Sequence, residues 1–246
     1  MHEQVRRGRH RPTAATTLAL GLLATGCGLL PGNTATGNTP TPSAPSASSA
    51  PSASPSPAPK PLDAKALLAA TLAAEEVYEA EAAAAVERRP GAIEQLSDPE
   101  CRQFLTLKDG ASAPTVVTQG FTWKNSSRGG TTLAAHGSVS EATDTFAQLR
   151  ASLSGCPFFS KADDADAPVV SVVDRPAPPE GDEALAFALT TDVPGQPGTL
   201  MEEHVVARIG TVIVDFRKLS SGAKGVRDFP TVLMSRQVSH LSLAQR

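Results

Sequence analysis

Ser221 and Lys224 have the spacing of the S-x-x-K pattern, in which the serine is the nucleophile of penicillin-binding enzymes. Those enzymes also carry S-D-N and K-T-G elements, and this chain has neither. The pair falls in a glycine-rich stretch near the C-terminus, so a solvated loop explains it better than a nucleophile does. The sequence also lacks a G-x-S-x-G nucleophile elbow and a glycine-rich phosphate loop. These observations favour a protein that is not an enzyme.

Acidic and histidine side chains, the usual ligands of metal ions, are not spaced as in a known metal site. Asp163, Asp164 and Asp166 resemble the start of a calcium-binding loop, but neither its glycine nor its twelfth-position glutamate follows. A solvated acidic turn is therefore expected there. Surface or hydrogen-bonded roles are expected for three histidines that lack a second ligand four residues away, namely His136, His204 and His240. We expect neither a metal nor another cofactor.

The N-terminus has the parts of an export signal. Four arginines within residues 6–11 form a basic segment, and residues 13–23 form an uncharged run of Ala, Thr, Leu and Gly. This run is much shorter than the ~20 residues that span a bilayer, so a permanent membrane helix is not expected. We therefore predict a signal peptide over residues 1–26. Arg6 and Arg7 leave the choice between general secretory and twin-arginine export open.

Cys27 follows the small pair Thr25-Gly26, and this arrangement resembles the lipobox of bacterial lipoproteins. In that family the cysteine thiol receives diacylglycerol and the chain is cut just before it. The sequence departs from the usual pattern at Ala24, where lipoboxes commonly carry leucine. The resemblance implies a lipid anchor at Cys27 and a protein on the outer face of the cytoplasmic membrane. The alternative is an ordinary secretory signal followed by an incidental cysteine.

Residues 27–61 are dominated by Pro, Ser, Ala, Thr and Gly, and Lys60 is their only charge. Such a segment has too little apolar surface to offset the entropy that is lost on ordering it. Its prolines favour an extended chain with a reach of at most ~100 Å. We therefore expect a disordered linker over residues 27–61, followed by a single domain over residues 62–246.

Chain length and charge limit the class of protein further. About 185 residues follow the linker, enough for one domain with a hydrophobic core. The formal net charge is −3, and removal of the leader, with its four arginines and one glutamate, takes it to −6. Nucleic acids and polybasic membrane contacts require clustered Lys and Arg, so neither is expected.

Helix-forming patterns mark three segments of the domain. Residues 62–89 are rich in Ala, Leu and Glu and contain no Gly or Pro, which predicts a long first helix. A second helix, capped by Ser138 or Ser140, is predicted over residues 141–153. A third is predicted to begin near Pro230, because proline is favoured at the first helical position.

Strand-forming patterns make up most of the remainder. The predicted strands cover residues 115–123, 131–138, 169–173, 184–191, 203–209 and 212–216. Gly210-Thr211 suits a tight hairpin between the last two. The segment with Asp98, Pro99 and Cys101 is expected to be a loop. Strand runs on either side of helices predict an α+β fold with a central antiparallel sheet packed by helices.

Cys101 and Cys156 are the two cysteines that remain once Cys27 is modified. In an exported protein such an even pair normally forms a disulfide. Closing a loop of that length stabilises the fold by roughly 4 kcal/mol in the chain-entropy account. Redox and metal roles are poor alternatives, because there is no C-x-x-C and no histidine beside either thiol.

Several of these segments together resemble the PknH-like extracellular sensor domain, which occurs on actinobacterial receptor kinases and on stand-alone lipoproteins. The resemblance rests on Cys101, the following strand pair, the capped helix that ends before Cys156, and the segments 181–184 and 205–212. It implies an α+β domain with a central antiparallel sheet and a cleft for an unidentified ligand. It brings no established catalytic residues. Members often carry two disulfides, whereas this chain can form one.

Two functions follow from these expectations. The favoured one is a lipid-anchored binding or sensor-like module that recognises an unidentified ligand of the cell envelope. Its recognition surface is predicted near the strand 115–123 and the hairpin around Arg208. Trp123 is a candidate contact, but a core position is the favoured interpretation of this side chain. The other function is a structural or accessory lipoprotein that docks to an envelope protein and binds no small molecule.

Overall fold

The computed structural model describes residues 58–77, 79–89, 96, 98–125, 127–162, 166–192, 199–221 and 228–246. These residues lie in one compact unit within residues 54–246. The predicted signal peptide, Cys27 and most of the predicted linker lie outside the described residues. None of the described helices combines the length and apolar character needed to cross a membrane.

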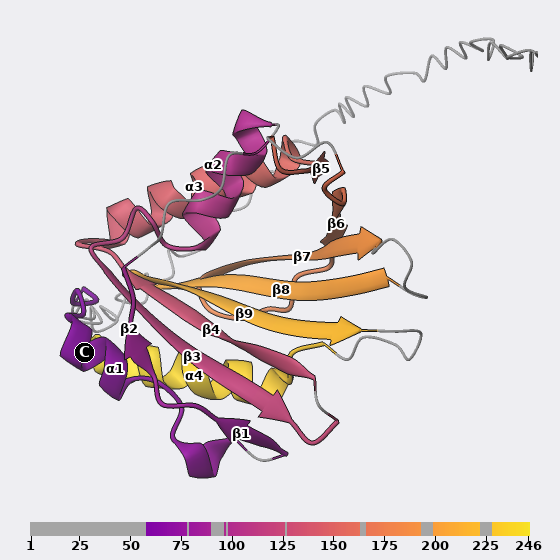
Figure 1. Ribbon diagram of the computed structural model, residues 1–246. Helices are drawn as coiled ribbons and strands as arrows, with labels where there is room; N and C mark the ends of the chain where they lie inside the picture. The colour runs from indigo at the N-terminus through magenta and orange to yellow at the C-terminus, as the bar shows by residue number, and fades with distance from the viewer. Residues whose placement is uncertain are drawn as a thin grey trace, which may run out of the picture. The chain divides into compact units, whose positions relative to one another are not determined.

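A nine-stranded, fully antiparallel sheet is the centre of the described domain (Figure 1). Its order is β1-β3-β4-β9-β8-β7-β6-β5, with β2 also paired to β3. The strands are β1 (Ala80–Ala82), β2 (Val86–Glu87), β3 (Thr115–Trp123), β4 (Arg128–Ala135), β5 (Phe158–Phe159), β6 (Val170–Arg175), β7 (Glu183–Asp192), β8 (Thr199–Ile209) and β9 (Val212–Ser221). The predicted α+β fold with a central antiparallel sheet is therefore confirmed.

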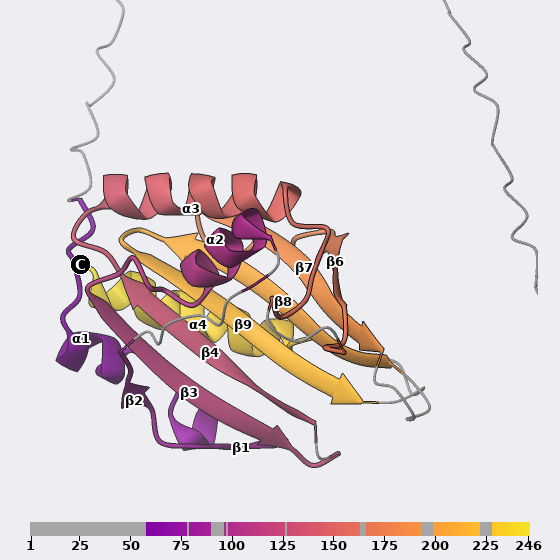
Figure 2. The same cartoon turned by 45° about the horizontal axis from the view of Figure 1, so that its top comes forward.

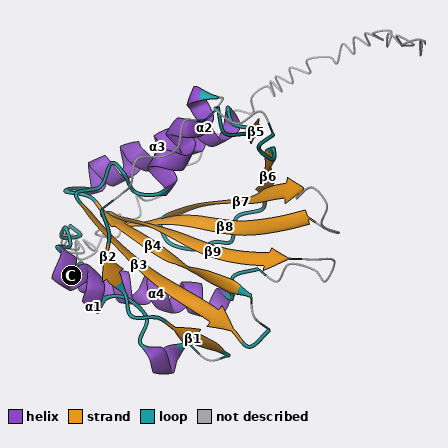
Figure 3. Cartoon of the chain, in the orientation of Figure 1, coloured by secondary structure: helices purple, strands orange, loops and turns teal. Residues whose placement is uncertain are grey.

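Helices cover both faces of this sheet (Figures 2 and 3). They are α1 (Ala64–Ala69), α2 (Pro99–Lys108), α3 (Val139–Ser154) and α4 (Thr231–Ala244), with a short 3-10 turn at Ala74–Glu76. One core lies between the sheet and α1 and α4, and its buried members include Leu67, Phe216 and Leu241. The other lies under α2 and α3, where Phe104 of α2 and Phe146 of α3 are buried in one cluster with Phe187 of β7.

The prediction of one long helix over residues 62–89 is wrong. Helix α1 ends at Ala69, and the chain then contributes β1 and β2 to the edge of β3. Ala83 N–H donates to Gly120 C=O at 2.8 Å, and Arg88 N–H donates to Val116 C=O at 2.8 Å. Helix propensities amount to at most ~0.7 kcal/mol per residue for ordinary side chains, so satisfying the backbone groups of a sheet edge outweighs them.

The prediction of a loop around Asp98 is also wrong, because a ten-residue helix, α2, begins there. The Asp98 carboxylate accepts from the backbone N–H groups of Glu100 at 2.8 Å and Cys101 at 3.1 Å. Pro99 occupies the first helical position, where its missing N–H costs nothing. Asp followed by Pro is therefore a helix-start signal in this chain.

Other predicted elements are confirmed with small shifts of their ends. Helix α3 spans Val139–Ser154, and the Ser138 hydroxyl accepts from Glu141 N–H at 3.1 Å as a cap. Glu141 completes the cap by accepting from Gly137 N–H at 2.8 Å. Strand β4 covers Arg128–Ala135 and so begins and ends earlier than predicted. Between β8 and β9, Gly210 has a φ of +56°, which favours glycine at this hairpin turn.

The last residues of the predicted linker lie against the domain. Lys60 N–H donates to Gln245 C=O at 2.9 Å, and Lys60 C=O accepts from the Thr211 hydroxyl at 3.4 Å. Gln245 also accepts, through its side chain, from Thr211 N–H at 2.7 Å. Both ends of the described unit are therefore fixed at the β8–β9 turn.

The predicted disulfide is present between Cys101 and Cys156. It joins the first turn of α2 to the second residue after the end of α3, and both cysteines are fully buried. Together with the apolar cluster around Phe104, it holds the two helices as one layer over the sheet.

Candidate functional site

The face of the sheet under α2 and α3 is divided into an apolar half and a polar half. On β7 and β8 its side chains include Leu185, Phe187 and Val206, which are buried against the two helices. On β3, β4 and β9 the register aligns three rows of side chains that continue across the same face, Thr118–Thr132–Asp215, Gly120–Gly130–Arg217 and Thr122–Arg128–Leu219. These rows are mostly polar, which is typical of a sheet face that stays in contact with water or a ligand.

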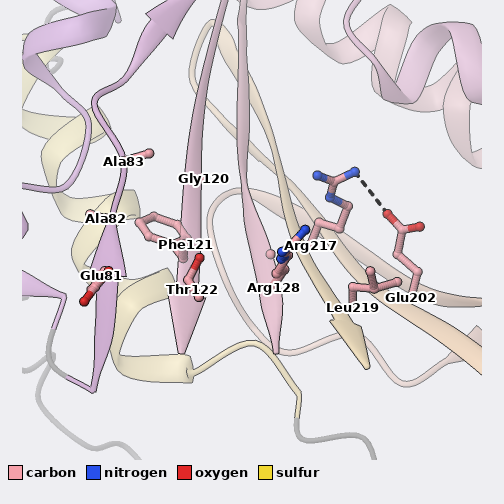
Figure 4. Close-up of a pocket in the computed structure, with 11 residues that line it drawn as sticks. Glu81, Ala82, Ala83, Gly120, Phe121, Thr122, Arg128, Glu202, Arg217 and Leu219 are labelled. Carbon is pink, nitrogen blue, oxygen red and sulfur yellow. Dashed lines mark ion pairs between the residues drawn. The ribbon is translucent and has the colours of Figure 1, made fainter. Parts of the chain in front are cut away.

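Two adjoining pockets open over this polar half. The larger has a volume of about 550 Å³ and is bordered by Glu81, Ala82 and Ala83 on the outer side, as Figure 4 shows. The smaller, about 270 Å³, reaches Lys108 at the end of α2. Gly120, Gly129 and Arg217 line both pockets, so the two are neighbours, and we call them together the sheet cleft. Its size suits a small ligand.

Two glycines that face each other form the floor of the sheet cleft. Gly120 pairs with Gly130 across β3 and β4. A Cβ added at Gly120 would meet nothing nearer than the Ala83 methyl at 3.8 Å, so it would project into free space. A Cβ added at Gly130 would lie 2.4 Å from the Gln119 carbonyl oxygen, so this position requires glycine. Gly120 is exposed and leaves its backbone accessible to a ligand from above, whereas Gly130 is buried.

Five charged or titratable side chains form a connected network along the inner side of the sheet cleft. His204 Nδ1 lies 2.9 Å from Asp215 Oδ1, and Lys108 Nζ lies 3.7 Å from Asp215 Oδ2. The other ring nitrogen of His204 lies 3.4 Å from Glu202 Oε1, and Arg217 Nη1 lies 3.3 Å from the same oxygen. We call Lys108, Asp215, His204, Glu202 and Arg217 the cleft charge network.

Because the cleft charge network is largely buried, the charge of each member depends on its neighbours in the network. The His204 ring is fully buried and stacks on the Phe187 ring, with centroids 4.7 Å apart. Burial disfavours its charged form, but the charge of Asp215 and the contacts with Asp215 and Glu202 raise the pKa of His204 above its usual value. Burial likewise opposes ionisation of Asp215, and the charges of His204 and Lys108 keep the pKa of this carboxyl below its usual value.

Stability is therefore expected to fall as the pH rises above 6.5. A histidine whose pKa is higher in the folded chain than its ordinary value of 6.5 contributes fully below pH 6.5 and loses that contribution as pH rises through the folded-state pKa. The measurement is urea unfolding at a series of pH values from about 6.5 to about 9.

The matched control for this pH dependence is His204→Gln. The variant is expected to be less stable and to lose the slope above pH 6.5, because the titrating group is gone. His136 does not interfere, since burial lowers the pKa of this side chain and its effect falls below pH 6.5. An unchanged slope in the variant would show that His204 is not the group responsible.

The two ligand-contact candidates of the sequence lie outside the sheet cleft. Trp123 is 7% exposed and packs edge-to-face on Phe121 and Phe229 in the core under α4. Arg208 is 9% exposed, and it donates to Asp182 at 2.9 Å and to Glu183 at 3.0 Å. The structure thus gives both side chains packing or ion-pairing partners and does not bring them together.

The remaining candidates are distributed over separate places. His240 pairs with Glu76 at 3.0 Å, and His136 is buried beside the turn that precedes α3. Asp163 and Asp164 lie outside the described residues, and so does Lys224 of the S-x-x-K pattern. Among the described residues, no group of three or more His, Cys, Asp or Glu side chains is placed to hold a metal ion.

Sequence reasoning missed the charged residues of the sheet cleft, although one signal was present. The tight turn at Gly210 fixes the register of β8 and β9, so that His204 pairs with Arg217. Asp215 is two residues before Arg217 and therefore lies on the same face, diagonal to His204. A buried histidine beside an aspartate could be inferred from this register. The contribution of Lys108 could not, because α2 was not predicted.

Comparisons with known proteins concern the fold. No protein-family model matches the chain, and no curated protein matches it. Among solved structures, the crystal structure of the extracellular domain of PknH from Mycobacterium tuberculosis is similar, with a TM-score of 0.57. The match covers 75% of this chain and 98% of that chain at 10% sequence identity. The chain therefore shares the fold of an extracellular domain of PknH, as the sequence resemblance implied.

Proposed function

We propose that this chain is an extracytoplasmic, sensor-like binding module that takes a small ligand of the cell envelope into the sheet cleft. The observation that carries the proposal is the uncovered polar half of the sheet face, with its paired glycines and the cleft charge network. Buried charges cost free energy unless they are paired, and natural proteins concentrate them at functional sites. The fold shared with the extracellular domain of PknH supports this class of function.

Lipid anchoring at Cys27 is part of the proposal. It is supported by the basic and apolar leader, the small residues before Cys27 and the Pro- and Ser-rich segment after it. The experiment is intact-mass measurement of the chain extracted from membranes of a bacterial host. A mass that begins at Cys27 and includes diacylglycerol would support the anchor, whereas an unmodified cysteine on a secreted chain would contradict it.

Ligand binding is tested by thermal unfolding of the purified chain against a collection of envelope metabolites. A ligand present at a hundred times its Kd stabilises the folded chain by about 2.7 kcal/mol, which appears as a raised Tm. The blocking variant is Gly120→Val, because its side chain would occupy free space in the sheet cleft.

Gly120→Val is expected to abolish the stabilisation and to leave the unliganded fold intact. Ser171→Val, on the exposed side of β6, is the matched control, and it is expected to keep the response. A collection in which no compound stabilises the chain, or in which Gly120→Val responds as the unaltered chain does, would contradict binding in the sheet cleft.

A second candidate function is docking to an envelope protein, and exposed apolar side chains favour it. Phe158 is 61% exposed and Val169 is 54% exposed. Phe158 pairs with Ser171, so it shares a face with Val169 and with Val173, which is 37% exposed. Co-purification of a membrane partner that depends on Phe158, without any metabolite response, would favour this function over the first.

A further inference from the structure

We propose that the sheet cleft binds an oxyanion, a carboxylate or phosphate group of its ligand, between the guanidinium groups of Arg128 and Arg217. The inference rests on the proposed function and specifies the chemistry of its ligand. It depends on where the two arginines lie, on how the surrounding carboxylates are already paired, and on the floor beneath them.

Arg128 and Arg217 are neighbours on adjacent strands. In the register of β4 and β9, Arg217 pairs with Gly130 and Arg128 pairs with Leu219. The two arginines are therefore diagonal to each other on one face of the sheet, a spacing that long side chains bridge readily. Figure 4 shows both side chains at the sheet cleft, on the neighbouring strands.

Both guanidinium groups have donors available. Arg217 is 53% exposed and meets Glu202 through one nitrogen at 3.3 Å, which leaves the other side of the fork unused by this contact. Arg128 is exposed, and no ion pair involves it among the residues that the structure describes. Arginine forks match the two oxygens of a carboxylate or phosphate, so a pair of them can hold an oxyanion from two sides.

The carboxylates near the two arginines are mostly compensated by other cations. Glu202 contacts His204 as well as Arg217, and Asp215 lies between His204 and Lys108. Asp109 pairs with Lys108 at 2.8 Å. The remaining acidic side chain of the lining, Glu81, belongs to β1 on the outer side. Among the described residues of the lining, Arg128 and, at the Lys108 end, Arg88 are therefore the cations that have no ion pair, and Arg128 is the one beside Arg217 whose charge a bound anion would balance.

The floor favours close approach of an anion. Gly120 and Gly130 place no side chain above the backbone beside Arg217. Thr122 and Thr132 flank this pair on the same face, and their hydroxyls can donate to an oxyanion. A neutral apolar ligand would bury the Arg128 guanidinium and these hydroxyls without giving them hydrogen-bond partners, at a cost in free energy.

The test is an NMR titration of the purified full chain with inorganic phosphate, and separately with succinate, at constant ionic strength maintained with potassium chloride. Saturable shifts are expected for the amides of Gly120 and Gly130 and for the side-chain Nε–H signals of Arg128 and Arg217. The probe that binds with the higher affinity identifies whether phosphate or carboxylate is preferred.

Substitutions assign the binding to the two arginines. Arg128→Gln is expected to weaken the affinity for the stronger probe at least tenfold, and the double variant with Arg217→Gln is expected to abolish saturation. Arg175→Gln is the matched control, because Arg175 is a partly exposed arginine on β6 whose ion pair is with Glu203, and it should leave the affinity unchanged. The proposal would be overturned if the shifts grew linearly with probe concentration in the unaltered chain and in every variant. It would also be overturned if Arg175→Gln lost as much affinity as Arg128→Gln.

These outcomes are distinguishable from failure of the proposed function. One possible result is a neutral metabolite whose binding is abolished by Gly120→Val but unaffected by the double arginine substitution. This result would overturn oxyanion recognition and would still support binding in the sheet cleft. Saturable binding of phosphate or succinate that both Gly120→Val and the arginine substitutions abolish would support both.

Discussion

Replacing Cys101 and Cys156 by alanine is expected to lower the free energy of unfolding by about 4 kcal/mol. The disulfide closes a loop between residues that are 55 positions apart, and the chain entropy that it removes from the unfolded state accounts for that amount. The loop includes β3, β4, α3 and most of α2, so the unfolded chain gains much freedom without the bond. Urea unfolding of the two chains at one pH measures the difference.

Reduction of the unaltered chain is the control for this prediction. In a reducing buffer its unfolding free energy is expected to approach that of the double alanine variant, because both chains then lack the bond. A difference of less than about 1 kcal/mol between the oxidised chain and the variant would show that apolar packing alone holds α2 and α3 together. The affinity of the sheet cleft is expected to decrease as well, since α2 carries Lys108 to it.

Long strands and the capped helix were predictable because their local signals agree with their tertiary environment. Strand β3 alternates between the two faces of the sheet, and α3 presents Phe146, Leu149 and Leu153 to one core while Ser138 caps it. The first segment of the domain differs. Its alanines form helices readily, but they offer little apolar surface for a helix to bury, and β3 otherwise lacks a neighbour on that side.

The sheet cleft was less predictable than the strands that form it. Its polar rows follow from alternation along β3, β4 and β9, but whether a polar face is covered depends on where the helices lie. Helices α2 and α3 cover the apolar half and leave the other half open, a consequence of the disulfide and of packing around Phe104. Arg128 and Arg217 thus appear in the sequence as ordinary charged residues of exposed strand faces.

Asp215→Ala is expected to lower the free energy of unfolding by about 3–5 kcal/mol, the range for breaking a buried ion pair from one side. The Asp215 side chain is 5% exposed and has two cationic partners, His204 at 2.9 Å and Lys108 at 3.7 Å. Without it, the buried His204 loses its nearest anion, and the buried Lys108 keeps Asp109 at 2.8 Å but loses its second carboxylate. Since the charge of Asp215 raises the pKa of His204, the variant should also lose stability less steeply above pH 6.5.

Glu183→Ala is a suitable control for Asp215→Ala, because Glu183 also contacts two cations but is partly exposed. Its partners are Arg150, which is half exposed, and Arg208, which keeps Asp182 when Glu183 is removed. A loss of about 1 kcal/mol or less is expected there. An equal decrease of the unfolding free energy in both variants would mean that the buried ion pairs of the cleft charge network contribute no more to stability than a partly exposed pair does.

A double substitution separates the ion pair from other effects of removing Asp215. Lys108→Met keeps most of the volume of this buried side chain and removes its charge. If unpaired charge causes the loss, Lys108→Met combined with Asp215→Ala should be more stable than the sum of the two single changes predicts, by about 1–3 kcal/mol. Additive losses would place the cost in packing around Asp215 and would weaken the view that α2 is fixed to the floor of the sheet cleft by charge.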